Sequence, residues 1–183
     1  MGASVCFLGA HAARAVNDPG STSQNAVTDR LTIELQRLGD TEAFGRKLGQ
    51  HLFPGAVVGL IGPLGAGKTQ LVRAVAEGLE IPDPRIVSSP TFVLIQEYDG
   101  RLPIYHFDVY RLRGAAEFDE LGVHEYFQGN GVCLVEWADR VRGSMPSERL
   151  DACLTVVGET ARRLELTGHG ERYCNLLAKL AQK

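Results

Sequence analysis

The residues with the clearest chemistry form one glycine-rich run. It matches the pattern G-x-x-x-x-G-K-[ST], in which glycines let the backbone wrap around a phosphate with its N–H groups pointing inward. The lysine of this pattern brings a positive charge to the terminal phosphates, and the hydroxyl that follows can bind Mg²⁺. The pattern predicts a phosphate-binding loop made of Gly62, Pro63, Leu64, Gly65, Ala66, Gly67, Lys68 and Thr69.

The segments on either side of this run support that interpretation over a chance glycine-rich turn. Residues 56–61 are continuously apolar, as expected of a strand that is covered on both faces. Residues 69–79 carry apolar side chains at helical spacing. A helix that begins there directs the positive end of its dipole at a bound anion.

A phosphate-binding loop of this kind works beside an acid that approaches the magnesium ion. The apolar run 132–135 is followed directly by Glu136, which is therefore the predicted metal-associated acid. The alternative is an ordinary acid at a strand end that faces water.

A second polar group lies in the sequence His106-Phe107-Asp108-Val109-Tyr110-Arg111. On an extended segment His106, Asp108 and Tyr110 share one face. Asp108 can then orient or deprotonate an attacking water molecule. The alternative is a structural network in which Asp108 pairs with Arg111.

Two further motifs carry weaker signals. The hydroxyls of Ser88-Ser89-Pro90-Thr91-Phe92 can sense a terminal phosphate as switch loops do, although a rigid turn is the preferred interpretation. Residues 119–122 spell D-x-x-G, a GTPase pattern. They fall within a predicted helix, and the sequence has no N-K-x-D element for guanine, so a GTPase is disfavoured.

The elements that must position these residues alternate between strand and helix, which predicts an α/β layer structure. Residues 93–98 and 102–108 predict a hairpin that turns at Asp99-Gly100. Residues 81–90 hold three prolines and predict a loop. The other predicted strands cover 31–35, 56–61, 132–135, 150–157 and 163–166, and the predicted helices cover 41–52, 69–79, 115–127 and 173–180.

Composition limits the class of protein. The chain has 183 residues, of which 44% are hydrophobic and 22% charged, which suits one globular domain and excludes wholesale disorder. The net charge of −3 offers no general attraction to nucleic acid or to an anionic membrane. No apolar stretch approaches the length of a membrane span. Residues 1–28 are predicted to be a disordered, non-targeting extension, and residues 29–183 the domain.

The four cysteines form no C-x-x-C pair, so the sequence predicts neither a zinc site nor a disulfide framework. Cys133 and Cys153 lie in apolar runs and are predicted to be small buried hydrophobic residues. This pattern fits a reducing, cytoplasmic compartment.

Taken together, the motifs resemble those of the TsaE (formerly YjeE) family, the bacterial ATPases needed to make threonylcarbamoyladenosine in tRNA. The resemblance covers about residues 34–176. It rests on L-G-A-G-K-T at 64–69, S-P-T-F at 89–92, H-F-D-V-Y-R at 106–111 and V-E-W at 135–137, in this order.

The resemblance implies a single-domain P-loop fold with a mixed, mostly central parallel sheet flanked by helices. It implies ATP and Mg²⁺ as ligands, slow ATP hydrolysis, and the proteins TsaB and TsaD as partners. TsaD is the enzyme that transfers the threonylcarbamoyl group, so tRNA is contacted indirectly at most.

The resemblance also implies roles for individual residues. Lys68 and Thr69 match the phosphate and magnesium positions, Glu136 the metal-associated acid, and Asp108 the acid needed for hydrolysis. Further residues implied to lie near the nucleotide are Trp137, Thr41 and either Arg162 or Arg163, of which Arg162 is the assigned one. The chain departs from the family at Pro63, where Asp is usual, and at Ala138, where Pro is frequent.

Two other functions stay open. A small P-loop kinase that acts on a nucleotide or metabolite has a similar length, and Arg140 and Arg142 can imitate its arginine lid. The second alternative is a nucleotide-dependent binding module with negligible catalysis.

Overall fold

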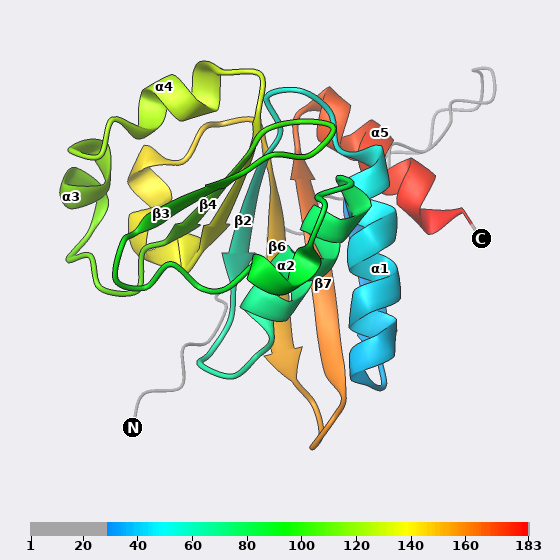
Figure 1. Ribbon diagram of the computed structural model, residues 1–183. Coiled ribbons are helices and arrows are strands. Elements are labelled where there is room, and N and C mark those ends of the chain that lie inside the picture. The colour runs from blue at the N-terminus through cyan, green and yellow to red at the C-terminus, as the bar shows by residue number, and fades with distance from the viewer. Residues whose placement is uncertain (1–28, 183) are drawn as a thin grey trace, which may run out of the picture.

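A seven-stranded mixed sheet runs through residues 29–182, the part of the chain that the computed structural model describes (Figure 1). The strands are β1 (Arg30–Leu35), β2 (Val57–Ile61), β3 (Ile95–Tyr98), β4 (Ile104–Asp108), β5 (Val132–Glu136), β6 (Arg149–Val156) and β7 (Arg162–His169). Their order is β1-β7-β6-β2-β5-β4-β3. The four neighbours β6, β2, β5 and β4 are parallel, whereas β7, β1 and β3 pair antiparallel. The predicted fold class is confirmed.

Helices cover both faces of this sheet. One face carries α1 (Leu38–His51), α2 (Lys68–Gly78) and α5 (Glu171–Ala181), and the other carries α3 (Ala115–Asp119), α4 (Val123–Gln128) and the 3-10 segment η2 (Ala138–Ser144). Two hydrophobic clusters result, one on each face. Every residue of β2 and β5 is buried between them. This double burial explains why both strands are continuously apolar in sequence.

The predicted strands and helices are confirmed apart from their ends, with two exceptions. The expected helix over 115–127 is two helices: α3 ends at Asp119, and Gly122, with a left-handed backbone at φ of 71°, directly precedes α4. The predicted loop 81–90 contains one short 3-10 turn, η1 (Pro84–Ile86).

The hairpin prediction is half right. Strands β3 and β4 pair antiparallel, but residues 99–103 connect them, so Asp99-Gly100 is not a two-residue turn. The Arg101 N–H donates to the Leu79 carbonyl at 2.8 Å, and Gly100 packs against the same carbonyl. The connection is therefore anchored to the end of α2, which local turn propensity does not foresee.

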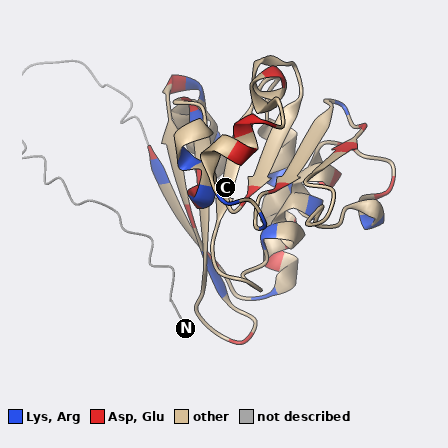
Figure 2. Ribbon diagram, turned by 90° about the vertical axis from the view of Figure 1, so that its left-hand side faces the viewer, with Lys and Arg blue, Asp and Glu red and all other residues tan. Residues whose placement is uncertain are grey.

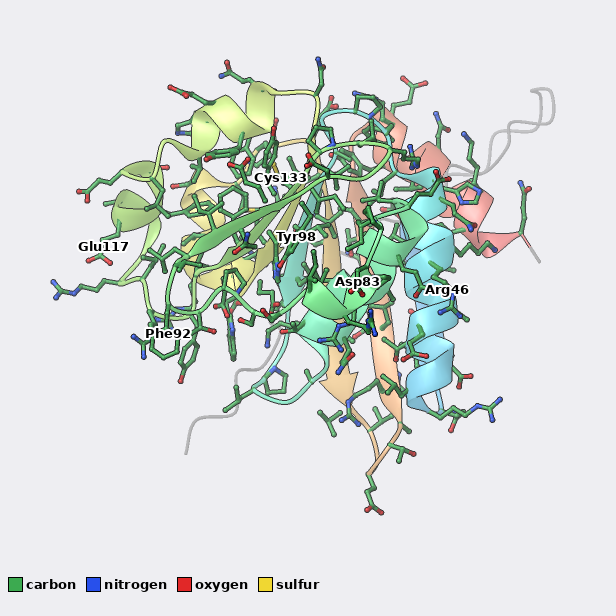
Figure 3. All side chains as sticks on the ribbon, in the orientation of Figure 1. Arg46, Asp83, Phe92, Tyr98, Glu117 and Cys133 are labelled. Carbon is green, nitrogen blue, oxygen red and sulfur yellow. The ribbon has the colours of Figure 1, made fainter. Side chains whose placement is uncertain are left out.

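The cysteine predictions divide. Cys133 is buried, and burial raises the pKa of its thiol to about 12 (Figure 3). Cys153 is only half-buried and packs against the hydrophobic cluster on the face of α3 and α4. Cys133 therefore behaves as the predicted core residue and Cys153 only partly so.

Charge is spread rather than gathered over the described residues: acidic and basic side chains are interspersed among the elements (Figure 2). Within residues 29–182 no helix is long and apolar enough to cross a membrane. The prediction for residues 1–28 lies outside the described part of the chain.

Candidate functional site

Three strand ends and one helix start meet at one edge of the sheet. Strand β2 ends at Ile61 and leads through residues 62–67 into α2, which begins at Lys68. Strands β4 and β5 end at Asp108 and Glu136, which are direct partners in the parallel register. The two acids predicted from sequence therefore lie side by side next to the glycine-rich loop, where ligands of open α/β sheets bind.

The loop needs its glycines for backbone reasons. Gly62, Gly65 and Gly67 all have positive φ angles, of 147°, 77° and 102°. A side chain at Gly62 would also collide with the Leu154 carbonyl. The loop thus adopts backbone angles that are unfavourable for residues with a side chain. Its last glycine, Gly67, is the residue directly before the first turn of α2.

Lys68 is held inside this loop, with 4% of its side chain exposed. Its Nζ donates to the carbonyls of Gly62 at 2.8 Å and Pro63 at 2.9 Å, and it lies 3.5 Å from the centroid of the Trp137 ring. Burial lowers the pKa of Lys68, and the nearby carboxylates, Glu136 foremost, oppose that shift. The ammonium is bound by weak neutral acceptors that an anionic phosphate can replace.

Glu136 connects the loop helix to the sheet. The Thr69 hydroxyl donates to its Oε1 at 2.8 Å and lies 3.1 Å from Oε2, and His106 Nε2 lies 2.9 Å from Oε1. Glu136 is 3% exposed, so the alternative of a strand-end acid that faces water is wrong. A hydroxyl and one carboxylate are the hard oxygen ligands that Mg²⁺ takes in nucleotide sites, beside phosphate and water oxygens. These residues fit a magnesium ion, although no cluster of three or more His, Cys, Asp or Glu forms within residues 29–182.

Asp108 is fixed by a segment that sequence reasoning undervalued. Its Oδ2 accepts from the Thr91 hydroxyl at 2.7 Å and from the Ser89 hydroxyl, while Oδ1 accepts from the Tyr110 N–H at 2.9 Å. The preferred interpretation of residues 88–92 as a plain rigid turn missed these contacts. One signal was available: an antiparallel hairpin of β3 and β4 brings the residues before β3 next to the end of β4.

The proposed pairing of Asp108 with Arg111 does not describe this network. The Arg111 guanidinium instead lies 4.2 Å from the centroid of the Phe92 ring. Phe92 is 81% exposed and projects outward at the rim of the molecule (Figure 3). Tyr110, beyond the end of β4, stacks against Trp137 with 4.9 Å between ring centroids. His106 and Asp108 share a face of the strand as predicted, and Tyr110 belongs to the turn after it.

The remaining predicted residues divide by position. Arg162 lies against the loop, where its Nε donates to the Ala66 carbonyl at 3.0 Å, whereas Arg163 pairs with Glu34 on β1. Thr41 is buried in α1, and within residues 29–182 it forms no hydrogen bond to the glycine-rich loop. Its place near the nucleotide therefore stays a prediction.

Comparison with known proteins gives one consistent family. A family model described as "Threonylcarbamoyl adenosine biosynthesis protein TsaE" matches residues 35–164. The tRNA threonylcarbamoyladenosine biosynthesis protein TsaE of Bacillus subtilis is 45% identical over 144 residues, covering 78% of this chain and 89% of the relative. The protein of the same name from Treponema pallidum is 41% identical over 125 residues, covering 68% and 91%.

A solved structure agrees with these relatives. The crystal structure of Bacillus subtilis YdiB superposes with a TM-score of 0.70 at 38% identity, covering 83% of this chain and 94% of that one. The resemblance inferred from the motifs is confirmed.

Proposed function

The chain belongs to the TsaE family, which acts in tRNA threonylcarbamoyladenosine biosynthesis, and we propose that it is an ATP-binding, slowly hydrolysing ATPase of that pathway. It depends on Mg²⁺ and works in the cytoplasm as the subunit that supports a TsaB–TsaD complex, without transferring the threonylcarbamoyl group itself. The observation that carries this proposal is the bond from Thr69 to Glu136 beside a buried Lys68.

Nucleotide binding uses the backbone N–H groups of the loop, the dipole of α2 and the ammonium group of Lys68. The backbone N–H groups of residues 62–69 and the start of α2 surround the phosphates. Lys68 exchanges its two carbonyl acceptors for phosphate oxygens, a stronger, charge-assisted pairing. Thr69 and Glu136 would hold the magnesium ion, which neutralises charge on the terminal phosphates when bound. Arg162 supports the loop through its bond to the Ala66 carbonyl.

Asp108 is the residue that orients or deprotonates the attacking water. In this structure the hydroxyls of Ser89 and Thr91 engage its Oδ2. A water molecule can reach that oxygen only by sharing it with these hydroxyls or replacing one of them. This competition supports slow hydrolysis by the isolated chain.

Replacing Asp108 with Asn separates hydrolysis from binding. We expect ATP turnover to fall by about 100-fold because the base is lost, while ATP affinity stays within about threefold because the loop contacts remain. Trp137 is the only tryptophan of the chain and lies 3.5 Å from Lys68 Nζ, so its fluorescence reports binding. The exposed Asp99→Asn variant is the matched control. Unchanged turnover in Asp108→Asn would reject its catalytic role and favour a binding module.

Partnership is tested by capture with the purified TsaB–TsaD pair, with and without ATP and Mg²⁺. Nucleotide-dependent capture is the expected result. Failure of capture, with ATP still bound to the isolated chain, would favour the kinase alternative and call for an acceptor screen. Arg140 gives that alternative little support, because its guanidinium donates to the Leu112 carbonyl at 3.0 Å.

A further inference from the structure

His106 is a polar ring placed in an apolar part of the molecule. It is fully buried on β4, two residues after the buried Ile104 and in register with the buried Leu134 of β5. The ring of Tyr98, seen near the middle of Figure 3, lies 6.5 Å away between centroids. An apolar side chain would fill this space without the cost of removing an imidazole from water. The polar atoms of the ring therefore need an explanation beyond packing.

The contacts of the two ring nitrogens assign the proton. Nε2 lies 2.9 Å from Glu136 Oε1, whereas Nδ1 is buried and has no hydrogen-bond partner within residues 29–182. A proton on Nδ1 would be an unsatisfied buried donor, so the favourable tautomer carries it on Nε2. His106 then donates to Glu136 Oε1, the same oxygen that accepts from Thr69.

Glu136 receives hydrogen bonds from two elements, from Thr69 on α2 and from His106 on β4. Its Oε1 is shared by His106 and the Thr69 hydroxyl, while Oε2 lies 3.1 Å from that hydroxyl and is 0.3 Å further from it than Oε1. A carboxylate on a single donor can rotate, and a second donor on one oxygen fixes its plane. Among the described residues no lysine or arginine forms an ion pair with Glu136. Its carboxylate is held in place by hydrogen bonds, and the nearest cation, Lys68, acts on it through space without a direct bond.

We infer that His106 is a positioning residue that orients the Glu136 carboxylate for the magnesium ion of the nucleotide. This inference rests on the proposed function, because it assigns to Glu136 the metal-associated role. Partners that hold a metal-binding side chain in its working orientation change metal affinity by about 10- to 100-fold when they are removed. His106 is thus expected to act on the magnesium-dependent part of nucleotide binding alone.

Three variants isolate the Nε2–H donor. His106→Phe keeps a ring of similar shape and removes the donor, His106→Leu removes both, and His106→Gln keeps an N–H that can reach Glu136. ATP affinity is measured for each by Trp137 fluorescence, once with Mg²⁺ and once with EDTA. We expect His106→Phe to lose about 10-fold or more of the gain in affinity that Mg²⁺ gives, with affinity in EDTA within about twofold, and His106→Gln to restore most of the gain. If His106→Phe does not fold, His106→Leu carries the same expectation.

Two outcomes overturn the inference. Donor-free variants that retain the full magnesium-dependent gain would show that the bond to Glu136 is not needed. Equal losses in Mg²⁺ and in EDTA would assign His106 to packing. Failure of the wild-type protein to bind ATP in either buffer is a different result, which rejects the proposed function and with it the role of Glu136.

A double-mutant cycle gives an independent readout. If His106 acts through Glu136, adding His106→Phe to Glu136→Gln causes no further loss of the magnesium-dependent gain. Additive losses would contradict the inference.

Discussion

Two histidine–carboxylate pairs flank β2, one on each neighbouring strand. On β5, Glu136 is bonded to His106 at 2.9 Å. On β6, Asp151 is bonded to His169 at 2.8 Å and also receives two bonds from Arg149, at 2.8 and 3.1 Å. Both strands pair with β2 in parallel, so the two carboxylates are comparable in depth along the sheet.

The pairs differ in whether the fold supplies a cation. The Arg149 guanidinium donates two charge-assisted hydrogen bonds to Asp151, so the charge of this carboxylate is balanced within the protein, without a ligand. Glu136 has no lysine or arginine among its hydrogen-bond donors, and the nearby Lys68 bonds to carbonyls instead of to the acid. Its side chain is also more deeply buried, at 3% exposure against 16% for Asp151. A buried carboxylate with no lysine or arginine bonded to it favours binding of a cation, so we take the Glu136 pair as the sign of a site and the Asp151 pair as structural.

The largest expected effect concerns activity. Glu136→Gln keeps the shape and the acceptor oxygen but removes the charge, so we expect ATP turnover in Mg²⁺ to fall by about 100-fold. Asp151→Asn should leave turnover within about threefold, because Asp151 touches no residue of the loop. Phosphate release from the two purified variants measures both values. Similar losses in both variants would remove the distinction between the pairs.

The free energy of unfolding should be affected in the reverse order, more by Asp151→Asn than by Glu136→Gln. Asp151→Asn leaves Arg149, whose side chain is 14% exposed, without its anionic partner, and we expect the free energy of unfolding to fall by about 2 kcal/mol. Glu136→Gln should change it by less than about 1 kcal/mol, because the Gln oxygen still accepts from His106 and Thr69. Urea unfolding followed by circular dichroism gives both numbers. A larger loss in Glu136→Gln would mean that its network holds the fold together.

A smaller effect follows from the pKa of Lys68. In the protein without nucleotide, burial lowers this pKa below the ordinary lysine value of 10.5. Bound phosphates favour the charged ammonium, so ATP binding takes up a proton once the pH passes this lowered pKa. We expect ATP affinity to fall as the pH rises from 7.5 toward 10.5, the ordinary pKa of a lysine. The same shift means that stability of the free protein rises with pH between the lowered pKa and 10.5, because the unfolded chain binds the proton more tightly there.

Trp137 fluorescence titrations across this pH range measure the affinity. Lys68→Arg is the control, because a guanidinium stays protonated throughout and should give a flat profile at its own, weaker affinity. A flat wild-type profile would show that Lys68 keeps its proton regardless of burial.

Local pattern was sufficient for the parts of the site that lie within one element or at its end. The glycines of residues 62–67, with Lys68 and Thr69 behind them, are specified by the backbone angles and the charge that a phosphate loop needs. Glu136 is indicated by the apolar run 132–135 before it, and Asp108 by the polar residues gathered at the end of a predicted strand. These signals are local, so no knowledge of strand pairing was required.

Pairing between distant segments decided the rest. His106 lies 30 residues from Glu136, and Ser89 lies 19 from Asp108, so neither contact follows from spacing along the chain. The same is true of the connection after β3, where contact with Leu79 replaced the turn that Asp99-Gly100 favours.

The sequence by itself thus indicated the groups that we propose bind phosphate and metal, because side-chain chemistry and loop conformation are properties of neighbouring residues. Only the tertiary structure decided that Glu136 is held by Thr69 and His106 and Asp151 by an arginine. The register of parallel strands and the closure of the β3–β4 hairpin set which side chains share a carboxylate, and those are long-range choices made by burial of the two sheet faces.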